Sequence, residues 1–218
     1  MAARVIDALQ YKLVAVDRGH IEALYEWDRL EPNRQLYTCR PVKALVDVEE
    51  YSDSLQQKIT RGELIMYVLV SIERRHLPLG RVRVFDFNAR NKSAEFGYYL
   101  PSHFRGKGLG GIMLTLFLDQ VFSFMDINKV YATTSSGNLR SIRLLERLGF
   151  SLDGRLREHY WVGTERFDQL NYSILSREWK RGRPETHGTD FGQADVKFLS
   201  SGSYTVAQVG SNSPKGDK

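Results

Sequence analysis

The feature that most constrains the fold of this chain is a glycine-rich run at residues 105–111, Arg-Gly-Lys-Gly-Leu-Gly-Gly. A segment typical of a strand, residues 95–100, precedes it, and an apolar segment typical of a helix, residues 112–118, follows it. A turn at a helix start leaves several backbone N–H groups unpaired at the positive end of the helix dipole. Glycine also lets an anion approach the backbone closely. The run therefore predicts a phosphate-binding turn between a strand and a helix.

The hydrophobic pattern along the chain predicts an α/β fold of the α+β kind, with helices on both faces of a mixed, mostly antiparallel sheet. Short connections between the strand-like segments favour antiparallel pairing in the first half of the chain. Residues 181–218 are rich in Gly and Ser and poor in apolar side chains, which predicts a flexible tail after one domain at 1–180. Strands are expected at 12–16, 64–72, 79–87, 94–100, 129–134, 156–162 and 169–175, and helices at 21–30, 46–60, 112–125 and 138–148.

Composition narrows the function classes. The longest apolar run, residues 64–72, is too short to span a bilayer, and the first residues lack the apolar core of a signal peptide. The single cysteine, Cys39, cannot form an internal disulfide, which favours a cytoplasmic location, and no neighbouring histidine favours a reactive thiolate. The net charge of +5 comes from scattered basic residues without a nucleic-acid or zinc signature. We therefore expect no nucleic-acid partner, no membrane partner and no metal site.

Three other interpretations of the glycine-rich run are weighed against a pyrophosphate cradle of another kind. Residues 106–111 match the dinucleotide fingerprint G-x-G-x-x-G, but the next strand-like segment ends in Thr and Ser, where that motif needs a carboxylate. A P-loop is excluded because no Gly-Lys-Ser/Thr closes the run. A merely structural connection explains neither the alternate glycines nor the flanking cations Arg105 and Lys107. A pyrophosphate cradle of another kind is the interpretation that remains.

Four segments, in the order of the family, resemble the GNAT N-acetyltransferases, and more closely the group with ribosomal-protein N-terminal and polyamine acetyltransferases. Residues 105–110 resemble the acetyl-CoA pyrophosphate loop, whose pattern is Arg/Gln-x-x-Gly-x-Gly/Ala. Residues 95–100 resemble the strand before that loop, and residues 138–150 resemble the later helix. Residues 158–168 resemble the late hairpin. The resemblance covers about residues 10 to 180 and implies a single GNAT-like domain that is splayed near Leu100.

The resemblance also implies a set of site residues with acetyl-CoA as co-substrate. Asn138 is expected to contact the pantetheine arm, and Ser141 lies close to it in sequence. The strand end is expected to offer backbone groups to the pantetheine and the thioester carbonyl, where preorganised N–H groups stabilise developing charge. The cofactor-binding residues are therefore Tyr98, Tyr99, Leu100, Arg105, Gly106, Lys107, Gly108, Leu109, Gly110, Asn138 and Ser141.

The sequence also offers candidates for the general base and the general acid. Glu95 is the first candidate for the general base, directly or through water; a structural pair with Arg81 or Arg83 is an equal alternative. Glu158 and His159 are weaker candidates. Many family members carry a Tyr seven residues after the Asn as general acid, whereas this chain has Leu145 there. Ser141 fits the slot of members that use a Ser, although a helix cap is its alternative role.

The acceptor is expected to be a primary amine, either a protein N-terminus or a small molecule such as an amino sugar or an aminoglycoside. Arginines are interspersed among the acidic residues of the segment 27–50, and the whole chain is basic, which argues against polyamines. A catalytically degenerate acetyl-CoA-binding sensor or interaction module is the alternative, because Leu145 replaces the usual Tyr. A homodimer is common in similar proteins, and the sequence itself leaves the oligomeric state open.

Overall fold

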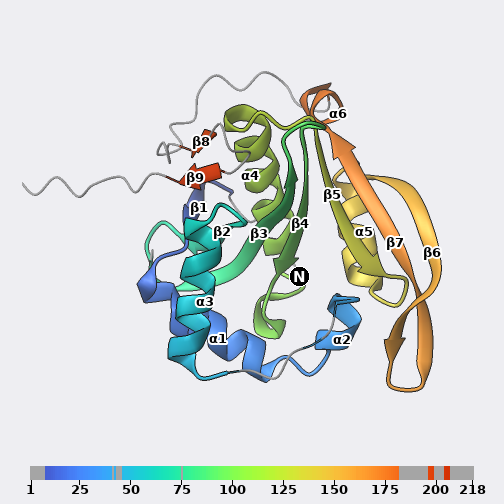
Figure 1. The fold of residues 1–218 in the computed structure, drawn as a ribbon, viewed down its shortest axis with the longest axis horizontal. Coiled ribbons are helices and arrows are strands. Elements are labelled where there is room, and N and C mark those ends of the chain that lie inside the picture. Colours follow the sequence, from blue (N-terminus) through green and yellow to red (C-terminus); the bar gives the residue numbers. More distant parts are fainter. Residues whose placement is uncertain are drawn as a thin grey trace, which may run out of the picture.

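The chain forms one open, seven-stranded sheet with helices on both faces (Figure 1). The computed structural model describes residues 8–40, 42, 46–74, 76–181, 196–198 and 204–206. The strand order is β1-β2-β3-β4-β5-β7-β6, and β4 with β5 is the one parallel neighbour pair in this sheet. The strands are β1 (Tyr11–Ala15), β2 (Leu64–Ser71), β3 (Pro78–Asn88), β4 (Ser93–Tyr99), β5 (Lys129–Ser135), β6 (Ser151–Val162) and β7 (Glu165–Leu175). The predicted mixed, mostly antiparallel sheet is confirmed.

The helices begin and end close to the positions that the sequence predicts. Asp47 caps the second predicted helix by accepting a hydrogen bond from the Glu50 backbone N–H at 2.8 Å. The short α2 and α6 are additions that the hydrophobic pattern does not show. The α-helices are α1 (Ile21–Leu30), α2 (Arg34–Tyr37), α3 (Val48–Thr60), α4 (Leu109–Phe124), α5 (Leu139–Arg147) and α6 (Ser176–Arg181), and short 3-10 turns lie at Ala8–Gln10, Arg18–His20 and Ser102–Phe104.

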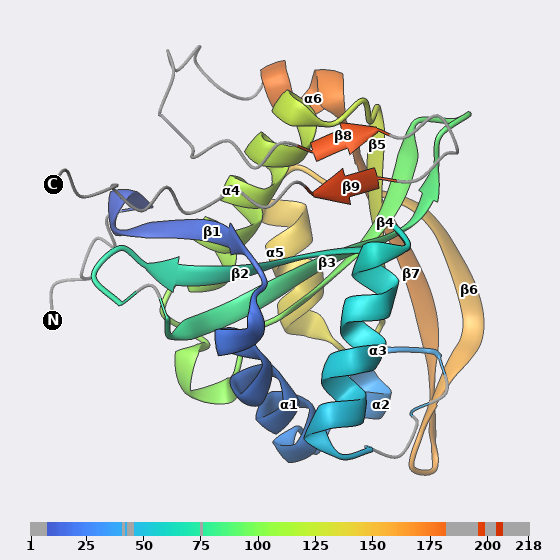
Figure 2. The same ribbon diagram turned by 60° about the vertical axis from the view of Figure 1, so that its left-hand side comes forward.

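Each face of the sheet has its own apolar core. Figure 2 shows α3 in front of the sheet and α4 and α5 behind it. Because side chains alternate along a strand, Val82, Val84 and Phe96 of β3 and β4 pack toward α4. On the other face, Leu24 of α1 and Leu55 of α3 close a smaller core. The α4 helix is apolar around most of its circumference because it lies buried between the sheet and α5.

The prediction of a flexible tail at residues 181–218 falls largely outside the described residues. Of the tail expected at 181–218, the structure describes the end of α6 and an antiparallel pair of three-residue strands, β8 (Val196–Phe198) and β9 (Tyr204–Val206). Within the described part of the chain, no helix is long and apolar enough to cross a membrane.

Candidate functional site

The two parallel strands β4 and β5 separate in the middle of the sheet. They pair only from Ser93 opposite Lys129 to Glu95 opposite Tyr131, yet β4 continues to Tyr99 and β5 to Ser135. Beyond Glu95, the edge of β4 that faces β5 carries backbone N–H and C=O groups without a ladder partner. Such groups need a partner when they are covered, and an extended ligand between the strands supplies one. The expected splay is present, and it starts four residues before Tyr99.

The glycine-rich run opens α4 close to the end of β4. Gly106 and Gly108 have left-handed backbones, with φ of 77° and 76°, and Gly108 is the residue that caps α4. A Cβ built at Gly106 would meet no atom within 4 Å, so this stretch of backbone is open to an approaching group. The N–H groups of Leu109 and Gly110 lie in the first turn of α4, where helical geometry supplies no acceptor. This is the arrangement expected of a phosphate cradle.

The Arg105 side chain, which the sequence predicts beside a phosphate, has three partners within the protein. Its Nε donates to the Leu100 carbonyl at 2.7 Å, its Nη2 to Glu31 Oε2 at 2.7 Å and its Nη1 to the Tyr37 hydroxyl at 3.2 Å. The buried Glu31 carboxylate needs a counterion, and Arg105 provides it. The cation that stays exposed at the glycine turn is Lys107, which lies over the Phe104 ring.

Glu31, which the sequence offered only as one of several acidic residues that could attract a cationic amine, is a further functional candidate. Its carboxylate is 9% exposed and also accepts a hydrogen bond from the Tyr99 hydroxyl at 2.8 Å. Burial raises its pKa, but the hydrogen bonds from Tyr99 and Arg105 outweigh burial and hold the pKa below its usual value. Glu31 thus links the loop after α1 to both ends of the turn between β4 and α4. The only local signal was a carboxylate beside Pro32 at a helix end.

Asn138 and Ser141 begin α5 as a capping pair. Asn138 Oδ1 accepts a hydrogen bond from the Ser141 backbone N–H at 3.3 Å, which leaves the amide nitrogen of the Asn138 side chain for other partners. The Ser141 hydroxyl lies 2.7 Å from the hydroxyl of Tyr98 on β4. Burial raises the pKa of Tyr98 to about 12. Leu145 is fully buried in the core, so a side chain at that position belongs to the packing of α5 against the sheet.

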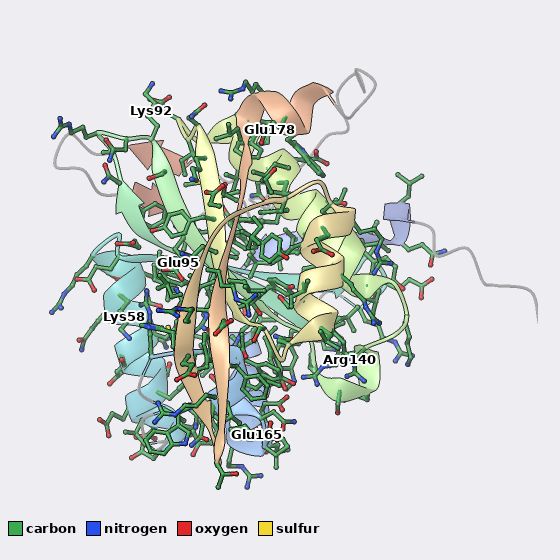
Figure 3. The ribbon with its side chains drawn as sticks, turned by 90° about the vertical axis from the view of Figure 1, so that its right-hand side faces the viewer. Lys58, Lys92, Glu95, Arg140, Glu165 and Glu178 are labelled. Atoms are coloured by element: carbon green, nitrogen blue, oxygen red, sulfur yellow. The ribbon has the colours of Figure 1, made fainter. Side chains whose placement is uncertain are left out.

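Glu95 lies at the point where the strands separate, and Figure 3 shows it toward the middle of the molecule, away from Arg140 at the start of α5. Its side chain accepts hydrogen bonds from Arg40 Nη2 at 3.0 Å and from Thr133 Oγ1 at 3.2 Å. Burial raises the pKa of Glu95, and the Arg40 cation opposes that rise. The arginine partner is thus Arg40, from the loop after α2, and not the neighbouring-strand Arg81 or Arg83 that the sequence offered.

Arg81 has a different partner. It is 4% exposed and forms a two-bonded ion pair with Asp28 of α1, which also accepts a hydrogen bond from the Tyr51 hydroxyl at 3.1 Å. Arg83, two residues further along β3, is exposed and has no ion pair among the described residues. Arg81 and Arg83 project from the same face of the sheet as Glu95, because their strand partners are Tyr99 and Gly97.

The late hairpin places its two candidate bases at the surface. Glu158 and His159 are exposed on an irregular stretch of β6, where Glu158 has φ of 53°. The Glu158 backbone N–H donates to Asp168 at 2.7 Å. Tyr160 is buried beside Thr133 and Cys39, and Cys39 itself is exposed. In the described part of the chain, no three His, Cys, Asp or Glu side chains converge as a metal site would require.

Comparison with known proteins agrees with this geometry. The family model described as the acetyltransferase (GNAT) domain matches residues 11–151. A putative ribosomal N-acetyltransferase of Bacillus subtilis is 30% identical over 101 residues, which is 46% of this chain and 55% of that protein. Spermidine N(1)-acetyltransferase of Vibrio cholerae is 24% identical over 174 residues, which is 78% of this chain and 95% of that protein.

A solved structure shares the fold. The crystal structure of spermidine N-acetyltransferase from Vibrio cholerae, in complex with CoA and spermine, superposes with a TM-score of 0.71 at 21% sequence identity. The superposition covers 78% of this chain and 98% of the Vibrio cholerae chain. A dodecameric structure of the Vibrio cholerae protein is also similar in fold.

Proposed function

The chain belongs to the GNAT acetyltransferase family, and we propose that it moves acetyl from acetyl-CoA to a primary amine, either a protein N-terminus or a small amine such as an amino sugar. The observation that carries this proposal is the opening between β4 and β5, which starts at Glu95 and ends beside the glycine turn that begins α4. Backbone groups of Tyr98, Tyr99 and Leu100 would hold the pantetheine arm and the thioester carbonyl. The N–H groups of the glycine turn, with Lys107, would hold the pyrophosphate.

The chemistry follows from the groups at the opening. The amine nitrogen attacks the thioester carbonyl carbon, the C–S bond breaks, and the amine proton passes to Glu95 directly or through a water molecule. A raised pKa makes Glu95 a stronger base than an exposed carboxylate. Ser141 donates a hydrogen bond to the departing thiolate, which takes its proton from water, since a thiol with a pKa of about 8.5 needs no strong acid to leave. The Ser141 hydroxyl, held by Tyr98, is the observation that favours an enzyme over a degenerate acetyl-CoA-binding module, because Leu145 offers no donor.

The face of the sheet that carries Glu95 is called the acceptor face. Its charges argue for an amine that is not a polycation. A polyamine site needs unpaired carboxylates, whereas three carboxylates on this face have arginine partners. An α-amine, with a pKa of about 7.7–8.0, is also far less protonated at neutral pH than a lysine amine, with a pKa of about 10.4. The three pairs are Asp28–Arg81, Glu31–Arg105 and Glu95–Arg40.

Release of free CoA, measured against a panel of amines, tests the proposal. The panel contains peptides with free and blocked N-termini, an amino sugar, an aminoglycoside and spermidine. We expect turnover with free N-termini or amino sugars and little with spermidine. A preference for spermidine would contradict the proposed acceptor class, and tight acetyl-CoA binding without turnover on any amine would favour the binding module.

A further inference from the structure

Arg83 lies on the acceptor face and, among the described residues, forms no ion pair, unlike Arg40, Arg81 and Arg105. It lies on β3 opposite Gly97 of β4, with Arg81 and Phe85 on either side of it on the same face. Gly97 has no side chain to cover it: a Cβ built there would lie 3.9 Å from the Arg83 guanidinium. Arg83 is exposed to solvent at this position. Its guanidinium therefore faces the side of the sheet from which an acceptor reaches Glu95.

The charges around Arg83 make it unfavourable for the Arg83 guanidinium to stay without a counterion. The carboxylate of Asp28 attracts Arg83, but Asp28 is already bound to Arg81 through both oxygens and to the Tyr51 hydroxyl. The like charges of Arg81 and Arg40 repel the Arg83 guanidinium. Asp86 lies beyond Phe85 and accepts a hydrogen bond from the Tyr131 hydroxyl at 2.5 Å. An added anion at Arg83 would relieve this repulsion.

The distance between Arg83 and the candidate base Glu95 suits one small molecule that contacts both residues. Phe85 pairs with Glu95 and Arg83 with Gly97, so Arg83 and Glu95 are diagonal neighbours on antiparallel strands. Such neighbours are about 7–8 Å apart between backbone positions, and an arginine fork reaches further. A molecule that places its amine at Glu95 can therefore place a second group, a few bonds away, against the Arg83 guanidinium.

We propose that Arg83 binds an anionic group, a carboxylate or a phosphate, carried by the same acceptor molecule whose amine is acetylated. The inference rests on the proposed function and deepens it by naming the acceptor class. Guanidinium suits both anions, since its planar fork matches carboxylate and phosphate oxygens. The amine stays beside Glu95, and a polyamine is rejected because Arg83 repels its second cation.

Matched acceptors test the proposal with the full chain. One pair is a peptide with Ser-Asp at its free N-terminus and the same peptide with Ser-Asn; the other is glucosamine 6-phosphate and glucosamine. In at least one pair we expect kcat/KM to be about tenfold higher for the charged member, the ratio that about 1.4 kcal/mol produces. The pair that shows the larger ratio identifies carboxylate or phosphate as the preferred anion.

Variants assign the preference to Arg83. Arg83→Gln should bring the kcat/KM of the charged acceptor down to that of its uncharged partner, and Arg83→Lys should keep part of the preference. Arg90→Gln removes another exposed arginine, from the β3–β4 turn, and should keep the full preference. Turnover of both members without preference, or a preference that survives Arg83→Gln, would overturn this inference and leave the proposed function standing. Acetyl-CoA binding without turnover of any acceptor would overturn both.

Discussion

The hydroxyl oxygen of Tyr98 lies 2.7 Å from Ser141 Oγ, which joins the end of β4 to the first turn of α5. We infer that Tyr98 donates and Ser141 accepts, because a phenol is more acidic than an aliphatic alcohol. The Ser141 proton is then directed away from Tyr98. In the proposed mechanism, Tyr98 is a positioning residue for Ser141, and the pair would fill the role that Leu145 cannot.

Replacing Tyr98 by Phe should lower kcat about tenfold, because Ser141 loses the donor that orients it, with the acetyl-CoA dissociation constant little changed. Ser141→Ala should lower kcat further, and the double variant should be no slower than Ser141→Ala, since the two hydroxyls act as one unit. Single-turnover kinetics measure the three rates. Tyr172→Phe removes a hydroxyl that bonds Glu146 on the far side of α5 and serves as the matched control. Additive losses would disprove the shared role.

Glu95→Gln should slow the reaction by about a hundredfold, because the amine loses its proton acceptor. In the unmodified protein, the rate should fall as the pH drops through a Glu95 pKa that burial holds above about 4.3. Arg40→Gln removes the cation that opposes this rise, so it should move the acid limb of the pH profile to higher pH. Glu22→Gln, on the exposed side of α1, is the control. An acid limb that Arg40→Gln leaves in place would show that Glu95 does not control it.

Gly108→Glu should weaken acetyl-CoA binding by a hundredfold or more. The substitution forces a side chain into a left-handed backbone with φ of 76° and places a negative charge at the helix end where the phosphates are expected. Gly163→Glu imposes the same backbone strain, with φ of 62°, in the β6–β7 turn, away from the cradle. Calorimetric titration with acetyl-CoA separates the two variants. Equal affinity in both would mean that the cradle lies elsewhere.

Asp28→Asn should lower the free energy of unfolding by about 3 kcal/mol, because it leaves the Arg81 cation buried without its partner. Burial raises the pKa of Asp28, but the charge and hydrogen bonds of Arg81 outweigh burial and lower it. The pair therefore stabilises the fold above the unfolded pKa of about 3.9, and this contribution is lost as the pH falls through the lower folded value. Denaturant unfolding at pH 7 and pH 2.5 should show a smaller penalty at the lower pH.

Much of the fold was predictable because local sequence carries burial and turn signals. Alternating apolar residues in 79–87 and 94–100 match β3 and β4, and the glycine-rich run begins α4 as expected. The short α2 and α6 were missed because four and six residues are too few for a helical period to show. The late strand was predicted to start at 156 and starts at Ser151, since its exposed first half lacks an apolar pattern.

The sequence by itself determined the order of the longer elements, the position of the glycine turn and the family of the protein. Tertiary structure alone decided which side chains meet: Arg105 with Glu31, 74 residues away, and Arg40 with Glu95, 55 residues away. Local periodicity records only whether a residue is buried and which face it occupies. The choice of an ion-pair partner depends on how distant elements pack, because a buried carboxylate takes whichever cation the fold brings within hydrogen-bond distance. Arg83 stays without a carboxylate partner among the described residues for the same reason.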